Sequence, residues 1–100
     1  MDLLQVIAEP KRREILHLVW DQELAASEIA ANFDVTFGAV SQHLGILRDA
    51  GLVSVRPDGN RRLYRADRER LEPFRPILEA MWAETLQGLA AHIEAESQSK

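Results

Sequence analysis

Ser41, Gln42 and His43 are adjacent polar residues whose types could serve either catalysis or recognition. A serine beside a histidine suits nucleophilic catalysis, in which the imidazole takes the proton of the attacking hydroxyl. The apolar rhythm around them predicts a helix, however, and residues two positions apart on a helix are separated by about 200° around its axis. Ser41 and His43 therefore cannot face each other as nucleophile and base. The better interpretation is a helix surface that fits a groove in a partner.

The helix that carries these residues is predicted over about 37–50. Thr36 precedes it and suits an N-cap, because its hydroxyl can accept a hydrogen bond from a free backbone N–H. Gly51 follows it and suits the residue after a helix. At 100° per residue, four apolar side chains fall within about 80° of one another and are expected to be buried, with Gln42 on the opposite side. The expected buried stripe consists of Phe37, Val40, Leu44 and Leu47.

Three shorter helices are predicted before this one. Leu3, Leu4 and Ile7 indicate a first helix that stops before Pro10, and Pro10 suits the first turn of a second helix. Residues 27–33 are typical of a third helix that ends at Phe33. With the turn after it and the helix at 37–50, this makes a helix-turn-helix over residues 27–50.

A β-hairpin and a long helix are predicted in the second half of the chain. Two alternating runs within residues 52–66 flank the turn formers Pro57, Asp58, Gly59 and Asn60. Apolar residues then recur at helical spacing, and a long helix is expected over about 74–95, because Pro73 and Pro76 disfavour an earlier start. The arginines of the hairpin region are Arg56, Arg61, Arg62 and Arg65.

This order of elements predicts a mainly α fold with a small β-hairpin, namely a winged helix-turn-helix with a long C-terminal dimerisation helix. One domain is expected over residues 1–96, with the wing at 52–66 and a frayed tail at 97–100. The chain has 100 residues, which is enough for one core and too few for two. No constellation of acid, base and nucleophile emerges, so an enzyme is not expected.

Charge is distributed unevenly along the chain. The net charge is -4 overall, but residues 36–66 contain five Arg and two Asp, a local charge of +3. Remote charges are largely screened beyond about 10 Å at 0.1 M salt, so a basic patch on an acidic body can still bind phosphates. Double-stranded DNA is therefore the expected partner. The sequence has no cysteine and no apolar run of about 20 residues, so we expect a cytoplasmic protein without a membrane span.

Several motifs at fixed spacings extend over nearly the whole chain. They are Pro10-x-Arg12-x-x-Ile15-Leu16, Ser41-x-His43-Leu44-x-x-Leu47-x-x-Ala50-Gly51-Leu52-Val53, Gly59-x-Arg61 and Tyr64. In combination, these motifs resemble the ArsR family of bacterial repressors. The resemblance implies a symmetric homodimer paired through the first and last helices. It also implies that the helix at 37–50 enters the major groove and that the hairpin reaches the backbone or minor groove.

Two sets of contact residues follow from this interpretation. Gln42 is expected to read sequence, because an amide pairs with adenine N6 and N7, while Ala39 suits a thymine methyl group. The predicted DNA contacts are Thr36, Gly38, Ala39, Ser41, Gln42, His43, Arg56, Arg61, Arg62 and Arg65. The predicted dimer contacts are Leu3, Leu4, Ile7, Leu78, Met81, Trp82, Thr85, Leu86, Leu89 and Ile93.

A metal switch is not expected, although many members of the family sense metals. The family's Cys-x-Cys run corresponds here to residues 25–27, Ala-Ala-Ser, which cannot replace thiolates. His92 and Glu96 supply two ligands, short of the three or four that zinc needs. We predict no cofactor. The resemblance is to family members without cysteine ligands, which implies that repression is relieved by an unknown small-molecule effector, by a protein effector or by autoregulation alone. The alternatives are a metal sensor that adds Glu84 and Asp67 as ligands, and an interaction module that has lost DNA binding.

Overall fold

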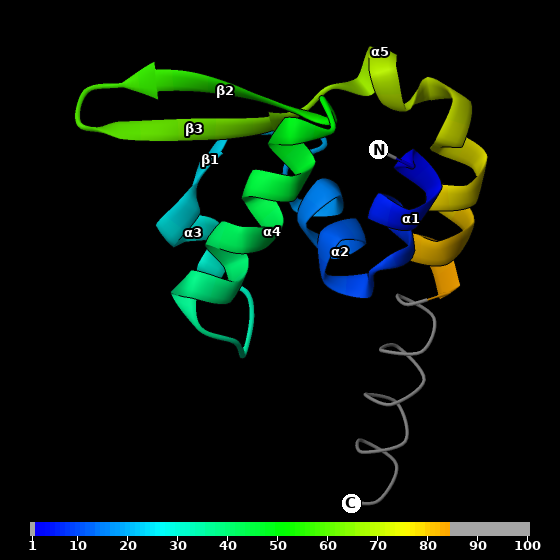
Figure 1. The fold of residues 1–100 in the computed structure, drawn as a ribbon, viewed down its shortest axis with the longest axis horizontal. Helices are drawn as coiled ribbons and strands as arrows, with labels where there is room; N and C mark the ends of the chain where they lie inside the picture. The colour runs from blue at the N-terminus through cyan, green and yellow to red at the C-terminus, as the bar shows by residue number, and fades with distance from the viewer. Residues whose placement is uncertain (1, 85–100) are drawn as a thin grey trace, which may run out of the picture.

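The computed structural model describes residues 2–84, and Met1 and residues 85–100 lie outside the described part. The helices pack around one core, and a long hairpin extends away from them (Figure 1). The helices are α1 (Leu3–Ala8), α2 (Pro10–Leu18), α3 (Ala26–Ala30) and α4 (Phe37–Asp49), and the hairpin consists of β2 (Val53–Asp58) and β3 (Arg61–Ala66). A short helix α5 (Arg68–Leu71) and a 3-10 turn (Glu72–Phe74) lead into a helix at residues 75–84. Between residues 2 and 84, every helix falls short of the length and hydropathy that a membrane span requires.

The corner between α1 and α2 is built by arginines of the first turn of α2. Pro10 occupies the start of α2, as its sequence position predicts. The last carbonyls of α1 have no partner within their own helix. Arg12 Nε donates to the Val6 carbonyl at 2.6 Å, and Arg13 Nη1 donates to the Ala8 carbonyl at 2.6 Å. Side chains of α2 thereby complete the end of α1 and fix the angle between the two helices.

Helix α3 is shorter than the sequence predicts. The helix ends at Ala30, so the expectation of a helix through Phe33 is wrong. The Asn32 side chain donates to the Glu28 carbonyl at 3.0 Å, and the Phe33 N–H bonds to the Ala30 carbonyl in a tighter i→i+3 turn. An Asn side chain that hydrogen-bonds the backbone competes with a regular helix, which accounts for the early end. Phe33 still packs against the core as a half-buried residue.

Helix α4 ends in a Schellman motif, which confirms the predicted role of Gly51. Gly51 has φ of 76°, and its N–H donates to the Arg48 carbonyl at 2.9 Å. The Leu52 N–H reaches back to the Leu47 carbonyl at 3.0 Å. A glycine adopts this left-handed conformation without a Cβ penalty. The sharp end directs the chain from α4 straight into the hairpin.

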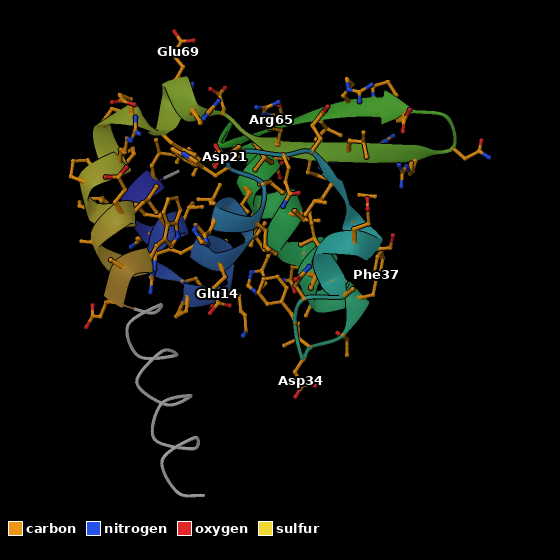
Figure 2. All side chains as sticks on the ribbon, turned by 180° about the vertical axis from the view of Figure 1, so that it is seen from behind. Glu14, Asp21, Asp34, Phe37, Arg65 and Glu69 are labelled. Atoms are coloured by element: carbon orange, nitrogen blue, oxygen red, sulfur yellow. The ribbon has the colours of Figure 1, made fainter. Side chains whose placement is uncertain are left out.

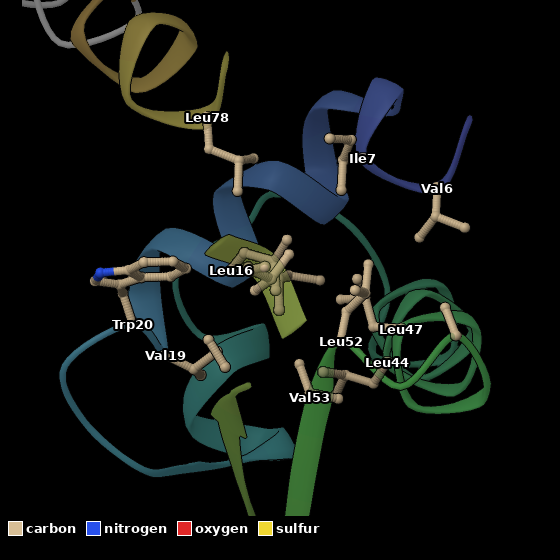
Figure 3. Close-up of a cluster of buried hydrophobic side chains, with 14 of the residues drawn as sticks. Val6, Ile7, Leu16, Val19, Trp20, Leu44, Leu47, Leu52, Val53 and Leu78 are labelled. Atoms are coloured by element: carbon tan, nitrogen blue, oxygen red, sulfur yellow. The ribbon is translucent and has the colours of Figure 1, made fainter. Parts of the chain in front are cut away.

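The core brings together α1, α2, α4, the base of the hairpin and the last helix (Figure 3). Three of the four residues predicted for the buried stripe of α4 are in it, and the fourth, Phe37, is 55% exposed. Phe37 is the first residue of α4, beyond the part of the helix that the core covers. Fully buried side chains include Ile15, Leu16, Val19, Ile29, Val40, Leu44, Leu47, Leu52, Leu71 and Leu78.

The hairpin belongs to a three-stranded antiparallel sheet with the order β1-β3-β2. Asp58 pairs with Arg61, so the turn contains Gly59 and Asn60 alone, and the predicted four-residue turn is too long. Pro57 lies within β2, where an edge strand tolerates a residue without an N–H. The third strand, β1 (Leu24–Ala25), was not predicted from the sequence. It pairs Leu24 with Tyr64 and thereby attaches the region before α3 to the wing.

Candidate nucleic-acid interface

Helix α4 presents a polar face of small residues. Ser41 and Gln42 are exposed, and Ala39 is half-buried. Gly38 and Gly45 also lie on this face, and a Cβ built on Gly45 would meet no atom within 4 Å. Packing within the protomer therefore gives no reason for a glycine at position 45, which costs about 1 kcal/mol of helix stability relative to alanine. The 13 residues of α4 span about 20 Å, and the major groove of DNA, about 12 Å wide, admits such a helix.

At the N-terminus of α4, the structure agrees with the N-cap role predicted for Thr36 and differs from the burial predicted for Phe37. Thr36 is the N-cap, and its Oγ1 accepts a hydrogen bond from the Ala39 N–H at 3.1 Å. Phe37 follows and lies at the edge of the molecule, in contact with solvent instead of the core (Figure 2). Helical periodicity gives the direction of Phe37 but not whether another element covers it. An exposed phenylalanine at this point is suited to an apolar base contact.

His43 points toward α2 and away from the solvent-exposed face. Its Nδ1 lies 3.3 Å from Arg12 Nη1, and its Nε2 lies 3.9 Å from a carboxylate oxygen of Glu9. The side chain is 21% exposed. A DNA contact was predicted for this residue, yet its partners among the described residues are Arg12 of α2 and Glu9, the N-cap of α2. Arg12 also holds the end of α1, so His43 is connected to the α1–α2 corner.

Two of the four predicted wing arginines are paired with carboxylates. Arg56 makes a bidentate contact with Glu23, with Nε–Oε2 at 2.9 Å and Nη2–Oε1 at 3.1 Å. Arg61 lies 3.4 Å from Glu28 Oε1 and 3.4 Å from Asp58 Oδ2. The hydrogen bond from Arg56, followed by the charges of Arg56 and Arg65, lowers the pKa of Glu23 below its ordinary value. Arg56 and Arg61 therefore each have a carboxylate partner in the free protein.

The other two wing arginines have no such partner. Among residues 2–84, the guanidinium groups of Arg62 and Arg65 form neither a hydrogen bond nor an ion pair. Arg62 is exposed and lies next to the hairpin turn, while Arg65 is half-buried near the base of β3. Figure 2 shows Arg65 where the hairpin joins the helical body. Sequence spacing grouped the four arginines together, whereas the structure divides them by their partners.

The residues predicted as dimer contacts differ in burial, and some of them lie outside the described residues. Ile7, Leu78 and Trp82 are buried within the protomer, where they belong to its core. The Trp82 indole N–H donates to the Arg13 carbonyl at 2.9 Å, which anchors the last helix on α2. Leu4 is 52% exposed. Leu3 and Met81 are half-buried. Thr85, Leu86, Leu89 and Ile93 lie outside the described residues.

A cleft lies between α2, the turn after α3 and the last helix. Its volume is about 370 Å³, and its lining includes His17, Phe33 and Trp82. The His17 ring packs on Trp82 with centroids 4.9 Å apart. Lys11 Nζ lies 5.4 Å from the centroid of Phe33. The cleft therefore combines aromatic surface with a nearby cation.

Within the described part of the chain, no three His, Asp or Glu side chains gather as metal ligands. Asp67 is the N-cap of α5 and accepts a hydrogen bond from the Arg70 N–H at 3.1 Å. Glu84 is exposed, and His92 and Glu96 lie beyond residue 84. The described residues thus give no support to a metal site at Asp67 and Glu84.

A helix that exposes small and polar residues, preceded by a helix and a turn and followed by a basic hairpin, defines a winged helix-turn-helix DNA-binding module. The sequence predicted this class, and solved structures of similar chains confirm it. The family model for bacterial regulatory proteins of the arsR family matches residues 9–55. The chain belongs to the ArsR family of bacterial transcriptional regulators. This is a family of regulators and not of enzymes, which agrees with the expectation from the sequence.

Three relatives illustrate the similarity. The HTH-type transcriptional regulator Rv2034 of Mycobacterium tuberculosis is 39% identical over 92 residues, which cover 92% of this chain and 86% of the relative. The arsenical resistance operon repressor of Staphylococcus xylosus is 34% identical over 70% of this chain and 67% of its own. The solution structure of the homodimeric winged helix-turn-helix domain of Mb0332 from Mycobacterium bovis has a TM-score of 0.68 at 28% identity. That match covers 80% of this chain and 74% of the other.

Proposed function

We propose that this protein is a homodimeric transcriptional repressor that inserts α4 into the major groove and places its wing on the phosphate backbone. Gln42 reads a base edge, with Ser41 and Ala39 beside it and Thr36 near the backbone. The exposed Phe37 adds an apolar contact that the sequence interpretation did not include. The observation that carries the proposal is the glycine-lined outer face of α4, because Gly45 has no packing role within the protomer.

Gly45→Leu tests this observation, because it should raise the stability of the fold and weaken DNA binding. Leucine is a better helix former than glycine, so the free energy of unfolding should rise by up to about 1 kcal/mol. The added side chain would project from the face that approaches the groove, and affinity for a preferred duplex should fall at least tenfold. Urea unfolding and fluorescence anisotropy measure the two effects. A variant that binds DNA as well as the wild type would show that this face does not enter the groove.

The preferred duplex is to be obtained by selection from a random pool. A dimer of this fold binds two half-sites, and the selected sequences should therefore show approximate two-fold symmetry. The centres of the half-sites should lie about 34–36 Å apart, or at a multiple of that spacing. Selected sequences without internal symmetry would contradict the homodimeric mode of binding.

The proposed dimer forms through α1 and the last helix. These helices lie side by side in the fold (Figure 1), and each exposes a large apolar side chain, Leu4 at 52% and Ile77 at 42%. Ile77 was not among the residues predicted from the sequence. The Mb0332 domain is homodimeric, which supports the same assembly here. Isologous pairing would remove both side chains from water in both protomers.

Leu4→Glu should convert the dimer into a species of 11.3 kDa at micromolar concentration. Two charges per dimer would be transferred from water into an apolar interface, a change that greatly weakens association. Sedimentation equilibrium measures the mass. Val35→Glu is the matched control, because Val35 is 40% exposed but lies in the turn before α4. Equal masses for the two variants would place the interface elsewhere.

Repression would follow because the bound protein occupies DNA that a polymerase needs. The protein would act in the cytoplasm, where bacterial DNA lies. The Staphylococcus xylosus relative carries the name of a repressor, which supports this direction of control. The metal-responsive alternative finds no cluster of ligands among residues 2–84. The module without DNA binding would account neither for the unpaired Arg62 on the wing nor for the exposed small residues of α4.

The cleft beside Trp82 is the proposed site of a small-molecule effector. Its volume of about 370 Å³ lies within the usual range for ligand sites. A ligand there would contact both α2 and the turn at residues 32–34, which leads into α4. A planar compound bound between Phe33 and Trp82 should quench tryptophan fluorescence and change operator affinity. Trp20 is the remaining tryptophan in the Trp82→Phe variant, so comparison with the wild type identifies the fluorescence that comes from the cleft.

A further inference from the structure

The wing has fewer free cations than its sequence suggests. Arg56 and Arg61 are held by Glu23 and Glu28, each of which precedes its partner arginine in the chain by 33 residues. Glu23 lies just before β1, and β1 and α3 lie beneath the hairpin in Figure 1. Pairing of β1 with β3 places Glu23 beside the sheet, where it reaches across to Arg56 on β2. The fold therefore supplies carboxylates to the wing from another part of the chain.

These ion pairs are exposed to solvent and therefore reversible. The Arg56 side chain is 57% exposed, and the Glu23 side chain is 29% exposed. Exposed pairs contribute about 0–1 kcal/mol, so a DNA phosphate can compete for the guanidinium. A bidentate carboxylate occupies the same donors that would bind a phosphate. Each phosphate contact by Arg56 must then replace an existing contact, whereas a contact by Arg62 replaces water alone.

We propose that Glu23 and Glu28 are internal competitors for DNA phosphates, which hold Arg56 and Arg61 so that the wing binds the backbone through Arg62 and Arg65. This inference rests on the proposed function of the wing. Phosphate contacts carry no sequence information, and they supply essentially all non-specific affinity. Carboxylates that occupy two of the four wing arginines lower the non-specific affinity for DNA and leave the base contacts of α4 unchanged. More of the protein is then free to find its operator.

Glu23→Gln is the direct test, because it removes the negative charge while keeping the shape of the side chain. The freed Arg56 should gain one phosphate contact per protomer. The slope of log affinity against log salt should become steeper by about 0.9 per new contact. The ratio of the affinities at 50 and 200 mM salt should then rise about threefold per contact, or about tenfold for a dimer. The change should be equal on preferred and random duplexes.

Three further variants make the result specific. Glu23→Gln combined with Arg56→Ala should return the salt slope to the wild-type value, because the freed cation is no longer present. Arg56→Ala alone should leave the slope nearly unchanged, since its guanidinium is occupied in the wild type. Glu79→Gln is the matched control: it removes the same charge from an exposed pair away from the wing, where Arg75 lies 2.8 Å from Glu79 and keeps Glu72 as a second partner at 3.7 Å. That control should leave the slope unchanged.

Arg62→Ala separates this inference from the proposed function. If Arg62→Ala flattens the slope and Glu23→Gln does not steepen it, the wing binds DNA but the carboxylate is not a competitor, and the inference is overturned. If neither variant changes the slope, the wing does not contact phosphates, and the proposed function of the wing fails as well. Thermal unfolding of each variant checks that the fold is intact. Glu23→Ala, which leaves no side-chain oxygen to accept a hydrogen bond from Arg56, should steepen the slope as much as Glu23→Gln or more.

Discussion

Leu47→Ala should lower the free energy of unfolding by about 2–5 kcal/mol. Leu47 is fully buried between α2 and the base of the hairpin, and its neighbours in the core include Leu16, Leu44 and Leu52 (Figure 3). Truncation to alanine removes apolar area and leaves a cavity that a close-packed core closes only in part. A small domain is stable by about 5–15 kcal/mol, so this single change removes a large share of the total.

Loss of DNA binding should accompany this change near 37 °C, because the buried stripe fixes the orientation of α4. Urea unfolding at one fixed protein concentration measures the effect, since dissociation of a dimer contributes to the apparent stability. Phe37→Ala is the matched control. It removes a larger side chain from the same helix but from a position that is 55% exposed, and it should change stability by no more than about 0.5 kcal/mol. Equal losses in the two variants would show that the N-terminus of α4 is packed after all.

Phe37 also shows where helical periodicity stops being informative. The positions of Val40, Leu44 and Leu47 on one side of α4 follow from the 3.6-residue repeat, and the structure buries all three. Phe37 has a similar angular position, but it lies at the first residue of the helix, where no other element reaches it. A repeat gives a direction around an axis, whereas burial also depends on position along the axis and on the neighbouring elements.

The caps were predictable, because their chemistry is local. Thr36, Pro10 and Gly51 each satisfy or tolerate backbone groups within a few residues, and the structure uses all three as the sequence indicated. Strand β1 was not predictable in the same way. It consists of Leu24 and Ala25 alone and is defined by pairing with residues about 40 positions later. A pairing of that range has no signature in a two-residue segment.

The charge state of the wing depends on the same long-range pairing. Arginine spacing correctly placed four cations in the hairpin, but Glu23 and Glu28, which pair with Arg56 and Arg61, lie in a segment joined to the hairpin by β1. His43 is a second example, because its angle on α4 allowed an outward position and its contacts with Arg12 and Glu9 turn it inward. For polar residues, sequence patterns identified candidates, and the tertiary contacts decided which of them are free to bind.

Gln42→Ala is the second large effect that we expect, and it concerns specificity. Gln42 is exposed on the outer face of α4, opposite the buried stripe, and its amide can donate to and accept from one adenine edge. Loss of a bidentate base contact should cost about 1–3 kcal/mol at the preferred duplex and little on random DNA, because random duplexes are held mainly through phosphates. Competition binding with both duplexes measures the difference. Gln5→Ala is the matched control. Gln5 is exposed on α1, and its replacement should change neither affinity.

The same comparison decides which part of the protein reads the bases. Selection from a random pool with the Gln42→Ala variant should yield a relaxed consensus at one position in each half-site, because a single amide contacts a single base pair. The same selection with Arg62→Ala should return the wild-type consensus at lower affinity, since a phosphate contact has no preference among bases. If Gln42→Ala instead keeps the full consensus and Arg62→Ala alters it, then the wing reads the sequence. In that case the small residues around Gln42 bring the wing close to the duplex without reading its bases.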